Sequence, residues 1–136
     1  MSEWNQRNRS VINEFRANGG HAGDRPLLLL TTTGARSGRR HTTPLMYLSD
    51  GDRLAVFASK GGDPAHPDWY HNLVANPTVT VEVAGDCFES QAIVAEPGER
   101  DRLYSLQSER YPNFAEYQQK AKRRIPVVLL ERKRGA

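Results

Sequence analysis

Apolar residues near the start of the chain recur at the spacing of a helix. Val11, Ile12 and Phe15 fall three to four positions apart between polar residues, and Trp4 extends the same face. This pattern predicts a short amphipathic helix over residues 3–17. We expect the helix to lie over the core or over a partner subunit. A position on a membrane surface is the less favoured alternative, because the apolar face is narrow and the polar face only mildly basic.

Apolar and β-branched stretches further along the chain are typical of strands. Residues 27–33 form a continuous apolar run that passes into threonines, as in a strand buried on both faces. Residues 78–83 alternate apolar and polar side chains, as a half-buried strand does. The six predicted strands cover residues 27–33, 42–48, 54–59, 78–83, 87–94 and 126–130.

Three short helices are predicted among these strands. The first begins at Pro67 and stops at Asn76, and an apolar stripe marks its buried face. That stripe consists of Trp69, Tyr70, Leu73 and Val74. The second helix runs from Pro97 toward Tyr111, and the third covers residues 113–124. Six strands with few, short helices predict a mainly β, α+β protein whose antiparallel sheet closes, or nearly closes, into a barrel.

The length and composition fit one domain in a reducing compartment. At 136 residues, the chain is expected to form one domain over residues 1–136, with a helix and a glycine-rich approach in 1–20 and the barrel core in 26–131. No apolar run approaches the roughly 20 residues that span a bilayer, and residues 1–20 lack the apolar segment of a signal peptide. The single cysteine, Cys87, fits the cytoplasm. We expect a cytoplasmic location without an integral membrane segment; attachment to the inner membrane surface stays open.

The charge is small in total but uneven along the chain. The net charge is +3, yet residues 120–134 hold seven basic residues against one acidic residue, Glu131. Local basic patches in a nearly neutral protein favour an acidic small molecule over a nucleic-acid duplex. No helix-turn-helix, zinc-finger or RNP pattern supports a nucleic-acid partner.

The break between the first two strands concentrates groups that bind anions. The loop Gly34-Ala35-Arg36-Ser37-Gly38 is followed at once by three further basic side chains, which are Arg39, Arg40 and His41. Guanidinium groups, hydroxyls and glycine-freed backbone amides together suit a phosphate or carboxylate. A solvated turn whose arginines serve solubility is an equally good explanation of the loop alone.

Further candidates follow the third strand, and each has a structural explanation as well. Lys60 stands before two glycines and could contact a phosphate, or it could protect a sheet edge. Trp69 and Tyr70 could stack on a ring or belong to the core, and Asn72 could bind a ligand or tie down a neighbouring loop. The aromatic residues of the last helical segment are equally explained by packing; they are Tyr111, Phe114 and Tyr117.

Common catalytic signatures are absent from the sequence. Ser37 falls one place late for a nucleophile elbow, and neither a P-loop nor a G-x-G-x-x-G fingerprint occurs. His66 and His71 are five positions apart, which separates them by roughly 140° on a helix. A metal site is therefore not expected.

Taken together, these residues resemble the deazaflavin-dependent nitroreductase family. The resemblance rests on TTTGARSGRRHTTPLMYLSDGDRLAVFASKGGDPAHPDWYHNLVANPTVTVEV and on the ending RYPNFAEYQQKAKRRIPVVLLERK, and it covers about residues 26–130. It implies a split β-barrel of the FMN-binding type, which binds coenzyme F420, an 8-hydroxy-5-deazaflavin. It also implies an oxidoreductase that passes the hydride of the reduced coenzyme to a quinone, nitroaromatic or enone acceptor. An FMN-dependent split-barrel reductase and a non-catalytic F420 carrier are the alternatives.

The resemblance also implies which residues hold the coenzyme. The loop and the lysine of ASKGG would bind its anionic end through Arg36, Ser37, His41 and Lys60, while Arg39 and Arg40 would meet the acidic tail. The floor and walls around the ring would be Pro44, Leu45, Ala58, Ser59, Trp69, Tyr70 and Asn72. An apolar slot of this kind needs only to orient donor and acceptor and to exclude water.

The acceptor end departs from the family pattern. Some relatives carry tyrosines where this chain has Met46 and Phe114, and those hydroxyls lie near the acceptor in members that reduce nitroimidazoles. The residues expected to contact the acceptor are Met46, Tyr111, Phe114 and Tyr117. Ser59 and Tyr117 are the candidates for hydrogen bonding or protonating it. A homodimer is expected, because the N-terminal helix and a barrel flank are available for contact.

Overall fold

The computed structural model describes residues 3–23 and 25–133, and in the first helix it describes the side chains from Arg7 onward. The strands are β1 (Leu27–Thr33), β2 (Arg40–Asp50), β3 (Arg53–Phe57), β4 (Thr78–Val83), β5 (Asp86–Val94) and β6 (Val127–Arg132). The helices are α1 (Glu3–Ala17), α2 (Asp68–Ala75), α3 (Pro97–Arg110) and α4 (Asn113–Ala121), with a short 3-10 turn, η1 (Lys60–Gly62). The predicted elements are confirmed, with ends that shift by a few residues.

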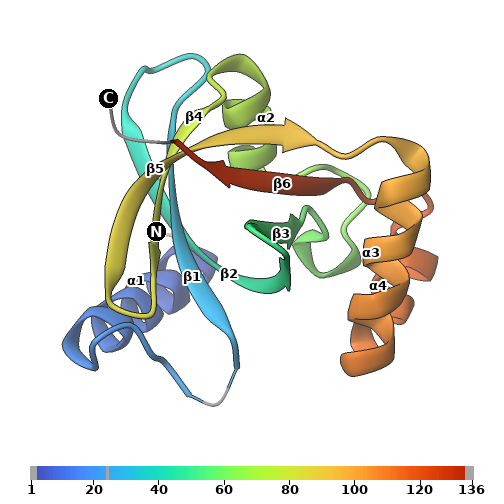
Figure 1. Ribbon diagram of the computed structural model, residues 1–136, viewed down its shortest axis with the longest axis horizontal. Coiled ribbons are helices and arrows are strands. Elements are labelled where there is room, and N and C mark those ends of the chain that lie inside the picture. Colours follow the sequence, from blue (N-terminus) through green and yellow to red (C-terminus); the bar gives the residue numbers. More distant parts are fainter. Residues whose placement is uncertain (1–2, 24, 134–136) are drawn as a thin grey trace.

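The six strands close into a barrel in the order β1-β2-β3-β6-β5-β4, and β4 pairs back with β1 (Figure 1). Every neighbouring pair is antiparallel. Short turns make this possible. Gly51 (φ 60°) turns the chain from β2 to β3, and the left-handed pair Ala84 (φ 50°) and Gly85 (φ 82°) turns it from β4 to β5. The predicted mainly β barrel is therefore confirmed.

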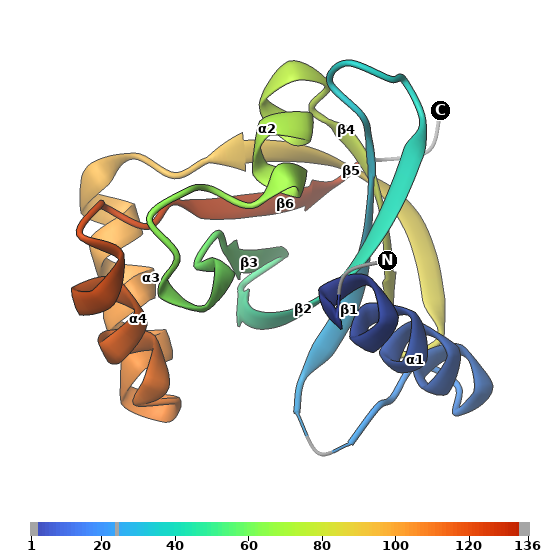
Figure 2. The ribbon, with the colours of Figure 1, turned by 180° about the vertical axis from the view of Figure 1, so that it is seen from behind.

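Alternate residues of β1 serve two different cores. Leu28 and Leu30 are fully buried inside the barrel, while Leu29 faces outward against Phe15 of α1. Since both faces are covered, β1 reads as a continuous apolar run. Figure 2 shows α1 on the outer side of the barrel. This agrees with the prediction that the helix lies over the core.

A third group of apolar side chains packs between the barrel and α3 and α4. Phe57 of β3 meets Tyr104 and Phe114 edge to face, with ring centroids 5.8 and 5.5 Å apart. α4 is shorter than predicted: it ends at Ala121 because Lys122 adopts a left-handed conformation (φ 56°). The packing fixes the position of α4 beside η1, which matters for the site.

The short helix α2 closes one end of the barrel (Figures 1 and 2). Trp69 and Leu73 are buried in the interior core, and Tyr70 is partly buried against it. Val74, predicted to belong to the same apolar stripe, is 57% exposed; an eight-residue helix that caps a barrel end turns only part of its surface inward. No helix in the described part of the chain is long and apolar enough to cross a membrane.

Candidate functional site

Two adjoining cavities lie where α1, the β1–β2 loop and α2 meet the first half of β2. The outer cavity has a volume of about 930 Å³ and is lined by Asn8, Arg9, Ile12, Gly34, Ala35, Arg36, Ser37, Arg40, His41, Thr42, Thr43, Asp68, Trp69, His71 and Asn72. The inner cavity has a volume of about 340 Å³ and is lined by Asn8, Arg25, Thr43, Pro44, Leu45, Met46, Phe57, Ser59, Lys60, Gly61, Pro67, Asp68, Trp69, Asn113, Phe114 and Tyr117. Four residues line both. These cavities are large enough for a small-molecule ligand.

The β1–β2 loop is folded tightly by its own backbone. Gly34 N–H donates to Arg39 O at 2.7 Å, and Gly38 N–H donates to Gly34 O at 3.0 Å. A Cβ on Gly34 would stand 2.5 Å from Ser37 Oγ and 3.3 Å from Arg39 O, so a larger residue here would displace the Ser37 side chain. The loop therefore has a shape defined by its own backbone hydrogen bonds.

Asn72 of α2 ties this loop to the barrel. Its Oδ1 accepts a hydrogen bond from Ala35 N–H at 3.0 Å, and its Nδ2 donates to Thr32 Oγ1 at 3.2 Å. The sequence left open whether Asn72 binds a ligand or ties a loop. It ties the loop, and it also lines the outer cavity.

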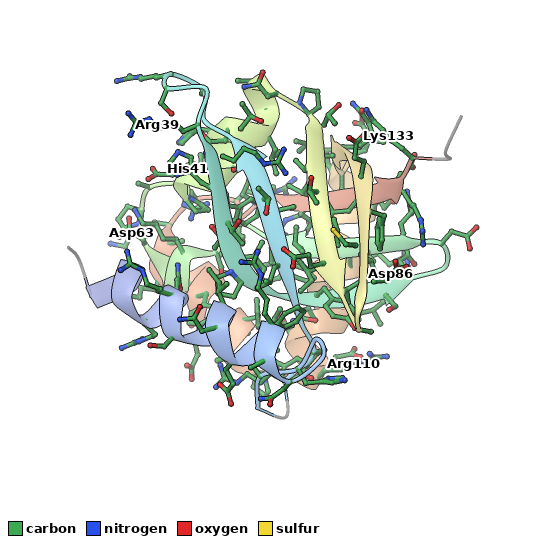
Figure 3. The ribbon with its side chains drawn as sticks, turned by 90° about the vertical axis from the view of Figure 1, so that its left-hand side faces the viewer. Arg39, His41, Asp63, Asp86, Arg110 and Lys133 are labelled. Carbon is green, nitrogen blue, oxygen red and sulfur yellow. The ribbon has the colours of Figure 1, made fainter. Side chains whose placement is uncertain are left out.

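The basic side chains of the loop are spread over the outer cavity and its rim. Arg36, Arg40 and His41 line the cavity. Arg40 Nη2 is anchored on Thr80 Oγ1 at 2.9 Å, which fixes the guanidinium against β4. Arg39 does not line either cavity; in Figure 3 it lies with His41 on one side of β2, while Lys133 lies at the opposite edge. The outer cavity is thus basic and hydroxyl-rich.

Lys60 lines the inner cavity from a strained turn. Its backbone is left-handed (φ 47°), and Gly61 and Gly62 follow with φ of 62° and 88°. A left-handed non-glycine residue costs energy and persists where the surrounding structure holds it. Gly62 also allows close approach to α4, since a Cβ there would stand 3.2 Å from Tyr117 Cα. The turn therefore places Lys60 beside the residues of α4.

The inner cavity is largely apolar, with hydroxyls at its α4 end. Tyr117 lines it, and its hydroxyl accepts a hydrogen bond from Asn113 Nδ2 at 2.9 Å, so the phenol keeps its own proton to donate. Ser59, Met46 and Phe114 line the same cavity. The predicted acceptor residues other than Tyr111 thus share one cavity.

A buried hydrogen bond anchors the backbone of α4, which lines one end of the inner cavity. Tyr104 O–H donates to Phe114 O at 2.6 Å, and burial raises the pKa of Tyr104 to about 12. Because the phenol stays protonated, it holds the carbonyl over the whole ordinary pH range. This contact fixes the start of the helix that carries Phe114 and Tyr117.

Four predicted site residues lie away from both cavities. They are Arg39, Ala58, Tyr70 and Tyr111. Ala58 is fully buried in the interior core, and Tyr70 packs against His66 with ring centroids 4.7 Å apart. Tyr111 caps the end of α3 and packs against the apolar side chains between the barrel and α3 and α4. A role for them in ligand contact stays a prediction.

Sequence reasoning missed several residues that line the cavities. Asn8, Arg9 and Ile12 come from α1, Arg25 precedes β1, and Asp68 begins α2. The only available signal was the polar face of the predicted N-terminal helix. This helix is far from the β1–β2 loop in sequence, so the sequence does not reveal that the two lie together in the fold. Among the described residues there is no group of three side chains able to hold a metal ion.

These features define a split-barrel protein in which a basic outer cavity adjoins a more apolar inner one. The chain belongs to the F420H(2)-dependent quinone reductase family, whose model matches residues 5–132. The resemblance found in the sequence is confirmed. The family is one of oxidoreductases that use reduced F420.

The similarity extends over most of the chain. It is 42% identical over 127 residues to the F420H(2)-dependent quinone reductase Rv1261c of Mycobacterium tuberculosis, covering 88% of this chain and 85% of that one. A second M. tuberculosis relative, the putative F420H(2)-dependent quinone reductase Rv3178, is 35% identical and covers 77% and 88%.

Solved structures agree. An F420-H2 dependent reductase (FDR-A) superimposes with a TM-score of 0.73 at 46% identity, covering 82% of this chain and 98% of that one. A structure described as a domain-swapped dimer gives a TM-score of 0.74 at 41% identity, covering 93% and 96%.

Proposed function

We propose that this chain binds F420 across the two cavities and reduces a quinone-like, nitroaromatic or enone acceptor. The observation that carries the proposal is the junction of a basic cavity with an apolar one, at which Asn8, Thr43, Asp68 and Trp69 line both. One molecule with an anionic tail and a planar ring would fill both. F420 has that form: a phosphodiester, a carboxylate and a glutamate tail follow the deazaflavin ring.

The outer cavity would hold the anionic part. Arg36 and Arg40 offer guanidinium groups, and Ser37 and His41 offer further donors beside them. Each charge-assisted hydrogen bond of this kind contributes about 1.5–3 kcal/mol. Arg40 is already oriented by Thr80, so part of the cost of ordering its side chain is met before the ligand binds.

The inner cavity would hold the ring and the acceptor. Pro44 and Leu45 of β2 and Trp69 of α2 provide apolar walls, and Lys60 lines the same cavity. When bound, the reduced deazaflavin supplies a hydride. The protein's part is to place the acceptor against the ring and to exclude water.

The α4 end of the inner cavity would serve the acceptor. Reduction of a quinone to a hydroquinone takes one hydride and one proton, and negative charge develops on the acceptor oxygen as the hydride arrives. Ser59 and Tyr117 offer hydroxyl protons to that oxygen, and Asn113 keeps the Tyr117 hydroxyl oriented as a donor. Met46 and Phe114 would line the apolar side of the acceptor.

A two-stage experiment tests this proposal. Calorimetric titration of the protein with purified F420 should show binding at micromolar concentrations, and reduced F420 should then be oxidised when a simple naphthoquinone is added. Absence of binding would overturn the proposal. Binding without acceptor-dependent oxidation across a panel of quinones, nitroaromatics and enones would favour a carrier, and selective binding of FMN would favour the FMN alternative.

We propose a homodimer as the assembly. Support comes from the relative whose structure is described as a domain-swapped dimer. Light scattering coupled to size-exclusion chromatography should give twice the mass of one chain. A mass of one chain at micromolar concentrations would contradict this expectation.

A further inference from the structure

We propose that Arg123 is a positioning residue for the coenzyme site: with His66 neutral, its guanidinium holds the turn that presents Ser59 and Lys60 to the inner cavity. The inference rests on the proposed function. It predicts that this arrangement, called here the Arg123 latch and formed by Arg123, His66 and the backbone of residues 58–65, opens when His66 gains a proton.

Arg123 closes the turn by binding the backbone at both of its ends. Nη2 donates to Ala58 O at 3.1 Å, where the chain leaves β3, and to Ala65 O at 3.1 Å, shortly before α2 begins. It also donates to Ser59 O at 3.2 Å, while Nε donates to Asp63 O at 3.1 Å. One planar group thus fixes four carbonyls of one segment, which a lysine ammonium on a flexible stem does not reproduce.

The turn needs such a hold because the left-handed conformation of Lys60 is unfavourable for a non-glycine residue. Gly61 and Gly62 are also left-handed, but glycine adopts this region without steric cost. Within the turn, only Gly62 N–H to Ser59 O at 2.9 Å and Asp63 N–H to Lys60 O at 3.1 Å close the backbone. A strained segment persists where the surrounding structure over-determines it. Here that structure is α4, packed against Gly62, together with Arg123.

The latch depends on the protonation state of His66. Arg123 Nη1 lies 2.9 Å from His66 Nδ1. A guanidinium can only donate, so Nδ1 must accept and the imidazole must be neutral, with its proton on Nε2. A protonated imidazole would turn an N–H toward an N–H and bring a second positive charge against Arg123.

The surroundings of His66 favour the neutral form. Its ring faces Tyr70 at 4.7 Å and His71 at 5.7 Å between centroids, both from α2, and Arg123 from the segment before β6. In its own segment, the carboxylate of Asp63 is engaged by Ala65 N–H at 2.8 Å. Burial, then Arg123, then His71 lower the pKa of His66 from its usual 6.5. The latch is therefore closed at neutral pH and opens as the pH falls through the lowered pKa of His66.

Arg100 provides a matched control. It is a buried arginine, whereas Arg123 is partly buried; its Nε donates to Ile125 O at 2.9 Å, and its guanidinium also contacts Gln118 and lies 4.5 Å from the Tyr104 ring. It ties α3 to the segment after α4 and lines neither cavity. Because Gln118 also donates to Arg123 O, a loss common to variants of both arginines reflects the support of the whole segment after α4 and not the contacts of the Arg123 guanidinium with the turn. A loss confined to Arg123 variants reflects the turn.

The experiment compares Arg123→Lys, Arg100→Lys and His66→Asn with the unaltered protein. Calorimetric titration with F420 at pH 7.5 should show affinity at least 10-fold weaker in Arg123→Lys and within 2-fold of the unaltered protein in Arg100→Lys. Between pH 7.5 and pH 5 the affinity of the unaltered protein should fall further than that of His66→Asn. Asparagine offers an oxygen near the position of Nδ1 and cannot be protonated. Any change in affinity that comes from protonation of the coenzyme affects both proteins equally, so the difference between them reports on His66.

A second readout needs no coenzyme. Proton NMR of the His66 ring, assigned from the signal lost in His66→Asn, should give a pKa below 6.5 that rises in Arg123→Met. Backbone amide exchange at residues 59–62 should accelerate as the pH falls, once corrected for the intrinsic rates. Equal affinities in Arg123→Lys and the unaltered protein, or a fall in affinity on acidification that is as large in His66→Asn as in the unaltered protein, would overturn the latch. If F420 fails to bind at any pH, the proposed function fails, and the ring titration and exchange still decide whether the latch exists.

Discussion

The side-chain amide of Asn72 joins Ala35, 37 positions earlier in the chain, through a 3.0 Å hydrogen bond from the backbone N–H of the loop. Its other end donates to Thr32 on β1. A single side chain thus sets the distance between α2, which carries Trp69 and His71, and the loop that carries Arg36 and Ser37. The shape of the outer cavity depends on this contact.

Asn72→Ala is expected to weaken F420 binding by roughly 10-fold, because two hydrogen bonds that orient the loop are lost, each contributing about 0.5–1.5 kcal/mol. Calorimetric titration measures the change. Asn76→Ala is the matched control: Asn76 follows the same helix, donates to Thr33 O at a longer 3.4 Å and lines neither cavity. Equal affinity losses in the two variants would contradict the role given to Asn72.

Lys60→Ala is expected to weaken F420 binding more than Arg132→Ala does. Lys60 lines the inner cavity, whereas Arg132 pairs with Asp86 at 3.0 Å and covers Phe88 on the opposite flank. Loss of one charge-assisted contact corresponds to about 1.5–3 kcal/mol, or roughly 10-fold to 150-fold in affinity. Equal effects of the two substitutions would remove Lys60 from the site.

Tyr104→Phe tests the anchor beneath α4. The free energy of unfolding should fall by about 1–2 kcal/mol, because Phe114 O loses its buried donor. The pKa of Tyr104 is raised to about 12 in the folded protein, against 10.0 for a free phenol. Its contribution is therefore complete below pH 10 and is lost as the pH rises toward 12. Chemical unfolding at pH 9 and pH 11 should show a smaller alkaline loss in Tyr104→Phe; identical losses would contradict this assignment.

The acceptor end can be tested by adding hydroxyls. Met46 and Phe114 line the inner cavity with side chains that carry no hydroxyl. Phe114→Tyr and Met46→Tyr are expected to raise the rate of nitroimidazole reduction relative to quinone reduction, since each brings a further proton donor toward the acceptor. Steady-state rates with both acceptors measure the ratio. An unchanged ratio with normal F420 affinity would show that these positions do not select the acceptor.

The barrel could be predicted from the sequence because each strand carries its own signal. β1 begins with four consecutive leucines because Leu28 and Leu29 face different cores, and β4 alternates because Val79 and Val81 face one. The loop glycines and Lys60 were also visible as local motifs. The loop and Lys60 lie at the same end of the barrel, because β1, β2 and β3 are consecutive antiparallel strands.

What the sequence concealed are contacts between segments that are distant along the chain. Arg123 lies in a basic run that reads as a solvated surface, yet it folds back onto residues 58–66, about 60 positions earlier. Asn8 and Arg25 lie outside every motif and still line the inner cavity. No spacing rule reveals such partners, because tertiary packing alone brings them together.

Trp69 separates the two cavities and is only 6% exposed. Its indole emission should therefore report the occupancy of either cavity, through resonance energy transfer to any near-ultraviolet absorber bound beside it. The sequence holds one other tryptophan, Trp4. A Trp4→Phe protein would carry a single intrinsic probe, so that loading and release could be followed in stopped flow without a label.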